Sequence, residues 1–265
     1  MSTCKIQCTL SYKIIQPTNI IFMVQAAHHP QQTILQEQLN FTPSTIWHEF
    51  QDVSHQNRSI RLQLETTESF ELNYTATVQR HLIHPCVQHY AEVPIHHLAD
   101  EVLPYLLASR YCNSDLLMEM AQRSFGWMEQ GYMRVQAIEQ WIFNNIFYVS
   151  GSTNHLTTAT DVLIHRAGVC RDFAHLGIAL CRALGIPARI VVGYVHIDDF
   201  IPDFHAVFEA YLEGGWVLFD ATRLAPVDRL VRIGTGIDAG DVAFATFYGE
   251  LELLRMKLDI VDESF

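Results

Sequence analysis

The first part of the chain alternates between short apolar and polar runs. Segments such as IQCTLSYKI, NIIFMVQAA and IRLQLETT are separated by polar breaks such as QPTN, TPST and SHQNRS. Alternation with a period of two places side chains on opposite faces of a strand, and closely spaced strands joined by polar turns are typical of a sandwich. We therefore predict an N-terminal antiparallel β-sandwich over residues 1–80.

The pattern then changes to the period of a helix. Apolar residues that recur every three or four positions predict helices over Leu98–Cys112, over about 116–126 and over Arg134–Tyr148. Another helix is expected to begin near Thr158, with Thr160 or Asp161 as its N-terminal cap before VLIHRAG. Together with later strands, these helices predict an α+β core over residues 98–265.

The segment HLIHPCVQHYAEVPIHH, residues 81–97, lies between the two patterns and contains two prolines, so we interpret it as a linker. It is rich in side chains that can bind a metal ion, namely His81, His84, Cys86, His89, His96 and His97. It has neither a CxxC pair nor a helical HxxxH pair, which are the usual spacings of zinc ligands. We therefore predict linker and surface histidines, and no metal site.

One later stretch predicts a helix that begins at a cysteine. Apolar residues recur from Phe173 to Leu184, and Gly185 and Pro187 follow as stop signals. Cys170 then falls in the first turn, where unpaired backbone N–H groups and the helix dipole favour a thiolate over a thiol. Cys170 is therefore a candidate nucleophile.

Three strands are predicted after this helix. Alternating positions indicate strands over 188–195, 205–212 and 216–219, and Gly214-Gly215 reads as a hairpin turn between the second and the third.

This hairpin brings His205, which begins one strand, close to Asp220, which follows the next. A carboxylate can orient an imidazole while the other ring nitrogen faces a thiol. The order Cys170, His205, Asp220 thus predicts a triad for nucleophilic catalysis.

Neighbouring residues of the same types are assigned other roles. His175 lies more than one turn beyond Cys170 and is interpreted as a packing residue. His196 ends a strand and stays a candidate for the edge of the cleft. Asp172 lies in the first helical turn and is assigned to capping, and Cys181 lies in the apolar stripe of the helix and is assigned to the core.

Acyl transfer would also need donors for an oxyanion. The backbone N–H of Cys170 is the first candidate, because it lies at a helix start. Trp141, Tyr148 and Tyr194 are aromatic candidates for the second donor or for the wall of the cleft.

Composition narrows the range of partners. The chain has 265 residues, of which 49% are hydrophobic, so it can bury a substantial core. Its net charge of -12 argues against nucleic acid as a partner. No apolar run reaches the ~18 residues of a spanning helix, and the six cysteines show no disulfide framework. We expect a cytoplasmic protein with reduced thiols and no membrane partner.

The motifs named above resemble those of a known family. GVCRDFAHL around Cys170, ALGIPARIVVGY, the FHA around His205 and the WVLFDAT around Asp220 are similar, in order and spacing, to the core of the bacterial transglutaminase-like superfamily. The segment LSYKIIQPTNIIFMV resembles the β-rich N-terminal region of many members. The resemblance implies a papain-like α+β core, a Cys-His-Asp triad, acyl transfer through a thioester and no organic cofactor. Val207 departs from the pattern, because many members have Trp there and that residue is expected to shape the cleft.

We therefore expect an enzyme that hydrolyses peptide or isopeptide amide bonds of a peptide or protein substrate. Transfer to an amine acceptor, as in a protein-glutamine transglutaminase, remains an alternative. So does an inactive peptide-binding or assembly module. Arylamine acetyl transfer is disfavoured because the RGGxC context is missing, and removal of N-glycans because paired CxxC motifs are missing. The oligomeric state is left open.

Overall fold

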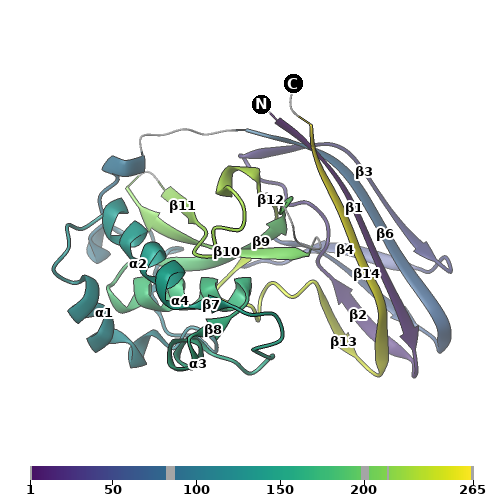
Figure 1. Ribbon diagram of the computed structural model, residues 1–265. Coiled ribbons are helices and arrows are strands. Elements are labelled where there is room, and N and C mark those ends of the chain that lie inside the picture. Colours follow the sequence, from purple (N-terminus) through teal and green to yellow (C-terminus); the bar gives the residue numbers. More distant parts are fainter. Residues whose placement is uncertain (1, 82–86, 198–202, 214, 264–265) are drawn as a thin grey trace.

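The computed structural model describes residues 2–81, 87–197, 203–213 and 215–263. It shows the predicted α+β architecture, in which two four-stranded antiparallel sheets form one half and a third four-stranded sheet with helices forms the other (Figure 1). Within the described part of the chain, no helix is long and apolar enough to cross a membrane.

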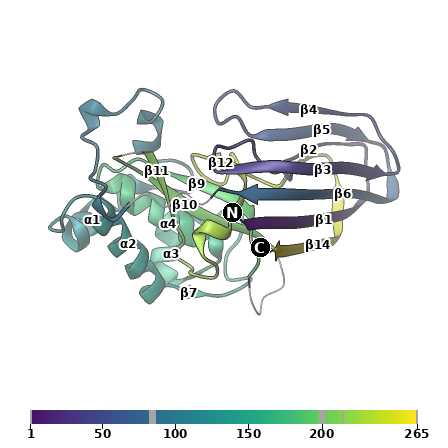
Figure 2. The same cartoon turned by 90° about the horizontal axis from the view of Figure 1, so that it is seen from above.

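The β-rich half consists of two four-stranded sheets. The first, sandwich sheet one, has the order β14-β1-β6-β3, with the bounds Leu251–Glu263, Ser2–Ile14, Thr67–Arg80 and Gln32–Thr42. The second, sandwich sheet two, has the order β13-β2-β5-β4, with the bounds Ala245–Tyr248, Thr18–Phe22, Arg58–Leu64 and Trp47–Gln51. Figure 2 shows these strands extending to one side of the helical half.

Alternation along β1 explains how the sandwich is held together. Every second residue from Cys4 to Ile14 is buried, while Lys5 and Gln7 are exposed. The buried face of β1 meets sandwich sheet two through an aromatic contact of Tyr12 with Phe22, whose ring centroids lie 5.9 Å apart. The N-terminal β-sandwich predicted from the alternating pattern is therefore confirmed.

The C-terminal strands differ from the predicted domain boundaries. Residues 98–265 were predicted to form one core, but β14 pairs with β1 over almost its whole length, and β13 pairs with β2. Without β14, the main-chain groups along one edge of β1 would be left unpaired. The last two strands therefore complete the two sandwich sheets, and the chain returns to its N-terminal half.

The other half is built on a sheet that we call the core sheet. Its order is β11-β10-β9-β12, with the bounds Gly215–Phe219, Phe204–Leu212, Ala188–Tyr194 and Val231–Gly236. Four helices accompany it: α1 Met118–Phe125, α2 Tyr132–Asn145, α3 Ala159–His165 and α4 Cys170–Ala183. A short parallel pair, β7 Phe147–Tyr148 and β8 Ala167–Gly168, leads into α4. Short 3-10 helices occupy Val87–His89, Ile95–His97, Leu103–Leu106, Ser114–Leu116 and Val227–Arg229.

Three helix predictions are corrected by the structure. The helix predicted over Leu98–Cys112 is reduced to a short 3-10 turn, because Pro104 has no N–H and cannot continue a helix from the preceding turn. The helix predicted to reach Tyr148 ends earlier, because the chain enters β7. The cap of α3 is Thr158: its side chain accepts from the Asp161 N–H, and the Asp161 carboxylate accepts from the Thr158 N–H at 2.9 Å.

The described part of the predicted linker is anchored to the core. Glu92 accepts a hydrogen bond from the Arg134 Nε at 2.7 Å and another from the Gly131 N–H at 3.0 Å. Both members of the ion pair are nearly buried. Of the predicted Gly214-Gly215 turn, Gly214 lies outside the described residues, whereas Gly215 begins β11 with a φ of 121° that favours glycine.

Buried hydrogen bonds join the two halves. The Gln32 side chain donates to the Arg232 carbonyl at 3.0 Å and accepts from the Arg232 N–H at 2.9 Å. The Tyr194 hydroxyl donates to the carbonyl of Val24 at 2.5 Å. Because these polar groups are removed from water, each needs its partner in the other half. The sandwich and the core sheet are thus held in one arrangement.

We predict that Gly177→Ala destabilises the protein, although alanine is the better helix former. A Cβ at Gly177, in the middle of α4, would lie 2.6 Å from the Phe208 ring on β10, so the helix would have to move off the sheet. Overpacking of this kind costs about 1–3 kcal/mol. Urea unfolding followed by circular dichroism measures the change. In the double variant, Phe208→Leu should restore part of the unfolding free energy that Gly177→Ala removes. If the effects of the two substitutions simply add, the steric clash between residue 177 and the Phe208 ring is contradicted.

Candidate active site

Cys170 is the first residue of α4, as the apolar spacing predicted. The turn before it is fixed by Asp172, whose Oδ2 accepts from the Val169 N–H at 2.9 Å and from the Thr153 hydroxyl at 2.5 Å. A Cβ at Gly168 would lie 2.8 Å from the Asp172 Cβ, so the glycine allows this close approach. Asp172 therefore caps the helix that carries Cys170, in agreement with its predicted role.

Cys170 differs from the other described cysteines in its surroundings. Cys4, Cys8, Cys112 and Cys181 are buried, whereas Cys170 is partly exposed. Burial raises the pKa of Cys4, Cys8 and Cys112 to about 12, and that of Cys181 is raised as well. These four thiols are therefore protonated and inaccessible at neutral pH.

His205 and Asp220 lie together as predicted. Their strands are adjacent, and the pairing of Phe208 with Phe219 brings the end of β11 near the beginning of β10. The His205 Nε2 is 2.9 Å from the Asp220 Oδ2, and both residues are buried. The other Asp220 oxygen accepts from the Thr222 N–H at 2.9 Å and from its hydroxyl at 2.7 Å. The carboxylate is therefore held by the turn and can orient the imidazole.

The Cys170 thiol approaches the same histidine. Its Sγ lies 4.0 Å from the carbonyl of Phe204, the residue before His205, and the thiol interacts with the imidazole. Burial alone would lower the pKa of His205, but the hydrogen bond to Asp220 and the interaction with Cys170 outweigh it and raise the pKa to about 10. At neutral pH the imidazole is therefore protonated, and Nε2 is the nitrogen bound to Asp220.

Of the three aromatic candidates, Tyr148 lies at the cysteine. Its hydroxyl interacts with the backbone N–H and the thiol of Cys170. Burial, followed by the charge of Cys170, raises the pKa of Tyr148 to about 12, so the hydroxyl keeps its proton and can donate. Tyr148 is still 38% exposed, which leaves it open to a ligand.

The other two aromatic candidates make their contacts elsewhere. Trp141 packs edge-on against Phe125 of α1 and lies under the Arg166 guanidinium at 5.1 Å. Tyr194 is fully buried, and its hydroxyl donates a hydrogen bond to the carbonyl of Val24 in the sandwich half. Tyr194 is therefore a residue of the joint between the halves, and its prediction as a cleft or oxyanion residue is corrected.

The remaining histidines near the site have structural partners. The His175 Nε2 accepts from the Ala239 N–H at 3.1 Å, and its ring stacks on Tyr111 at 5.1 Å. Burial lowers the pKa of His175 to about 4, so the ring is neutral, as expected for a packing residue. The His196 Nδ1 lies 3.2 Å from the carbonyl of Ile260 on β14. His205 is thus the histidine that meets Cys170.

Val207 lies inside the protein and not on a cleft wall. It is 2% exposed and belongs to a small apolar cluster with residues such as Val191 and Leu230. In this chain the side chain at this position is therefore covered by other apolar groups.

The described residues also bear on the metal question. They contain no group of three or more His, Cys, Asp or Glu side chains gathered closely enough to hold a metal ion. His84 and Cys86 of the predicted linker lie outside the described residues, and the absence of a metal site stays a prediction.

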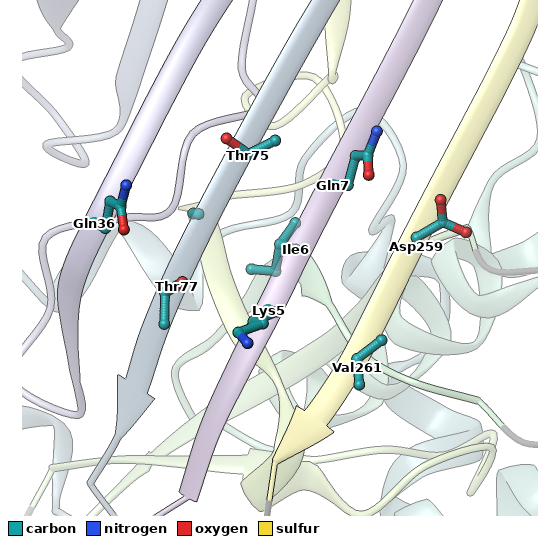
Figure 3. A pocket seen from close by; sticks show the side chains of 9 residues that line it. Lys5, Ile6, Gln7, Gln36, Thr75, Thr77, Asp259 and Val261 are labelled. Carbon is teal, nitrogen blue, oxygen red and sulfur yellow. The ribbon is translucent and has the colours of Figure 1, made fainter.

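A separate hollow lies far from the cysteine in the fold, on the outward face of sandwich sheet one. Polar side chains from its four strands line it, among them Gln7, Gln36, Thr75, Thr77 and Asp259 (Figure 3). Its lining also includes Ile6 and Val261, and it contains no cysteine, serine or histidine.

Sequence reasoning missed two partners of Asp220. Thr222 binds its carboxylate, and Glu139 on α2 accepts a hydrogen bond from its backbone N–H at 3.1 Å. A signal for Glu139 was present, because it lies four residues after the buried Val135 and one after the buried Ile138. A carboxylate beside the apolar stripe of a helix indicates a polar partner inside the protein.

An α+β core with a cysteine at a helix start and a His-Asp pair on adjacent strands is an arrangement typical of thiol-dependent enzymes. Residues 119–221 match the family described as the transglutaminase-like superfamily, and residues 3–101 match the family described as the bacterial transglutaminase N-terminal domain. The chain belongs to the bacterial transglutaminase-like superfamily.

Individual relatives agree with this assignment. A solved structure from Cytophaga hutchinsonii, described as a "putative cysteine protease", is 44% identical, superposes with a TM-score of 0.94 and covers 100% of this chain and 91% of that one. An uncharacterized protein of Mycobacterium leprae is 34% identical over 117 residues, 41% of this chain and 42% of that protein. Another from Mycobacterium bovis is 36% identical over 115 residues, 38% of this chain and 37% of that protein. The aligned region spans about two fifths of the length of each of these two curated relatives.

We predict that iodoacetamide alkylates Cys170 at least about tenfold faster than Cys112 or Cys181 at neutral pH. The reason is that Cys170 is partly exposed at a helix start, whereas the other two thiols are buried and protonated. Peptide mass spectrometry at several reaction times measures the rates. In urea the three rates should converge, and equal rates in the native protein would refute the assignment of the nucleophile.

Asp220→Asn should lower stability most at acidic pH. Because the pKa of His205 is raised from 6.5 to about 10, its contribution is fully present below about pH 6.5 and is lost as the pH rises through about 10. Asparagine cannot hold the imidazolium, so the difference in unfolding free energy between the two proteins should shrink as the pH rises. Urea titrations across this range measure it. A difference that is the same at every pH would mean that only the turn was disturbed.

Proposed function

We propose that the protein is a thiol-dependent acyl-transfer enzyme that hydrolyses amide bonds of a peptide or protein substrate, either in the peptide chain or as isopeptide bonds. The observation that carries the proposal is the meeting of three groups: Cys170 at the start of α4, His205 in contact with it, and Asp220 at 2.9 Å from the far nitrogen of His205. The family membership supports the same chemistry.

In the proposed first step, the Cys170 thiolate attacks the carbonyl carbon of the amide. A C–S bond forms, the carbonyl oxygen becomes an oxyanion, and the C–N bond then breaks. The imidazolium of His205 gives its proton to the leaving amine, and a thioester remains. Because the pKa of His205 is raised to about 10, the proton is already on the imidazole when the substrate arrives.

The oxyanion would be bound by the Cys170 backbone N–H and the Tyr148 hydroxyl. Both groups lie at the sulfur, and the hydroxyl keeps its proton at neutral pH. Donors fixed in advance stabilise the developing charge more than mobile water does.

In the second step, water attacks the thioester carbon. His205, now neutral, takes a proton from the water, the C–S bond breaks, and the acid leaves as Cys170 regains its thiolate and His205 its proton. No organic cofactor or metal enters this scheme. If a primary amine replaces the water, the same steps give a new amide, which is the transglutaminase alternative.

The inactive binding module is the second alternative. It is disfavoured because His205 contacts both Cys170 and Asp220, and Cys170 is partly exposed. The five described cysteines are unpaired, which suits a reducing, cytoplasmic compartment.

Incubation with a peptide library, with and without a primary amine, tests the proposal by mass spectrometry. We expect free acids as products, and amine-bearing products would favour the transglutaminase alternative. Cys170→Ala should abolish turnover, and His205→Ala should lower kcat by about 10²–10⁴. Cys112→Ala is the matched control and should leave kcat unchanged. No turnover of any peptide by a folded protein with a reactive Cys170 would favour the binding module.

A further inference from the structure

A second hollow lies beside the turn that carries Cys170. It has a volume of about 280 Å³, and its lining comes from the loop 152–157, from α3 and from β8. Pockets that enclose a whole small ligand have volumes of roughly 300–1,000 Å³. The hollow is therefore suited to one side chain of a larger substrate.

The wall formed by the loop is fixed onto the first turn of α4. The Thr153 hydroxyl, which lines the hollow, donates to the Asp172 Oδ2 at 2.5 Å. The Arg171 Nη2 donates to the carbonyl of Asn154, another lining residue, at 2.8 Å. The other wall, α3, packs against α4 (Figure 1). The hollow is thus held in place by the same helix turn that presents Cys170.

The hollow is also within reach of a peptide bound at the sulfur. Ala167, which lines it, begins β8 and lies three residues before Cys170. Three residues of chain span at most about 11 Å. An extended peptide covers this distance with about three residues, because a strand rises about 3.3 Å per residue. A substrate side chain close to the attacked amide can therefore enter the hollow.

Asp161 supplies a carboxylate to the hollow. Its Oδ2 accepts from the Thr158 N–H at 2.9 Å and from the Thr158 hydroxyl at 2.8 Å, and these bonds hold the pKa of Asp161 below its usual range. None of the hydrogen bonds among the described residues uses its Oδ1. Capping of α3 thus occupies one oxygen, and the other is left for a ligand.

The rest of the lining contains no group that neutralises this charge with a fixed cation. His165 is the other ionisable side chain of the lining, which contains no lysine or arginine. The guanidinium of Arg171 is already paired with the Asp172 carboxylate at 2.9 Å. Leu156 and Ala167 add apolar surface, and Ser152 adds a hydroxyl that can accept a hydrogen bond. One carboxylate beside apolar surface fits a positive charge on an aliphatic stem.

We propose that this hollow is a substrate subsite for a primary ammonium group on an aliphatic stem, as in the lysine side chain of a peptide. The stem lies along Leu156 and Ala167, and the ammonium group donates to the free oxygen of Asp161 and to the Ser152 hydroxyl. The inference rests on the proposed function and names one feature of its substrate.

Peptides with a thiol-reactive group test the subsite without turnover. One series carries a chloromethyl ketone at its C-terminus and the other an iodoacetyl group at its N-terminus, so the peptide extends from Cys170 in either direction. Lysine is compared with norleucine, which has the same stem without the ammonium group, at each of the three positions nearest the reactive group. Peptide mass spectrometry measures the labelling rate of Cys170.

We expect lysine to be favoured over norleucine by about threefold to fivefold at one of these positions, the size of effect that a partly exposed ion pair produces. Added salt should reduce this ratio, because it screens exposed charges. Both measurements use the wild-type protein, so they do not depend on the folding of a variant.

Asp161→Asn isolates the charge, because the amide oxygen can still accept from Thr158 and cap α3. The preference for lysine should disappear in this variant, while its rates with the norleucine peptides and with iodoacetamide stay at the wild-type values. Asp228→Asn is the matched control: it removes an exposed carboxylate outside the lining and should keep the preference.

The outcomes separate the subsite from the proposed function. Equal rates for lysine and norleucine at every position, or a preference that persists in Asp161→Asn, would overturn the subsite while the triad stands. If iodoacetamide alkylates Cys170 of the wild type no faster than Cys112, the proposed function itself is wrong and the subsite falls with it.

Discussion

The contact between α4 and β10 is the constraint on which the site depends. Gly177 in the middle of the helix leaves just enough room for the Phe208 ring, so helix and strand lie as close as their backbones allow. One end of that helix carries Cys170, and the start of that strand carries His205. Because a packed core has little freedom to deform, this contact sets the distance between sulfur and imidazole. The chemistry therefore depends on apolar packing seven residues away from the cysteine.

Electrostatics then decides which protonation state the site holds. Burial would make His205 neutral, as it does His175 on α4, whose pKa is lowered to about 4. The difference is the Asp220 carboxylate, held by Thr222 and by the backbone hydrogen bond to Glu139. At neutral pH, His175 is thus neutral and His205 is positively charged, because only His205 has an anionic partner at hydrogen-bond distance.

The β-sandwich is more than an appended domain. Its two sheets are completed by β13 and β14 from the end of the chain, and its hydrogen bonds to β12 and to Tyr194 fix one side of the core sheet. The described part of the segment between the halves is likewise tied down, through Glu92 and Arg134. The support of the core sheet therefore comes from residues far from it in sequence, and both halves must form for either to be complete.

The local pattern of apolar and polar residues determined several elements of the fold and one contact of the site. The alternation of apolar residues predicted the sandwich, the helical period predicted the helix that begins at Cys170, and the spacing of His205 and Asp220 across a hairpin predicted their pairing, because each depends on neighbours in sequence. Tertiary structure alone decided the rest. Tyr148 rather than Tyr194 meets the sulfur, Glu139 reaches Asp220 from another helix, and β14 returns to β1. These contacts join residues that no local period relates, so only the packed chain brings them together.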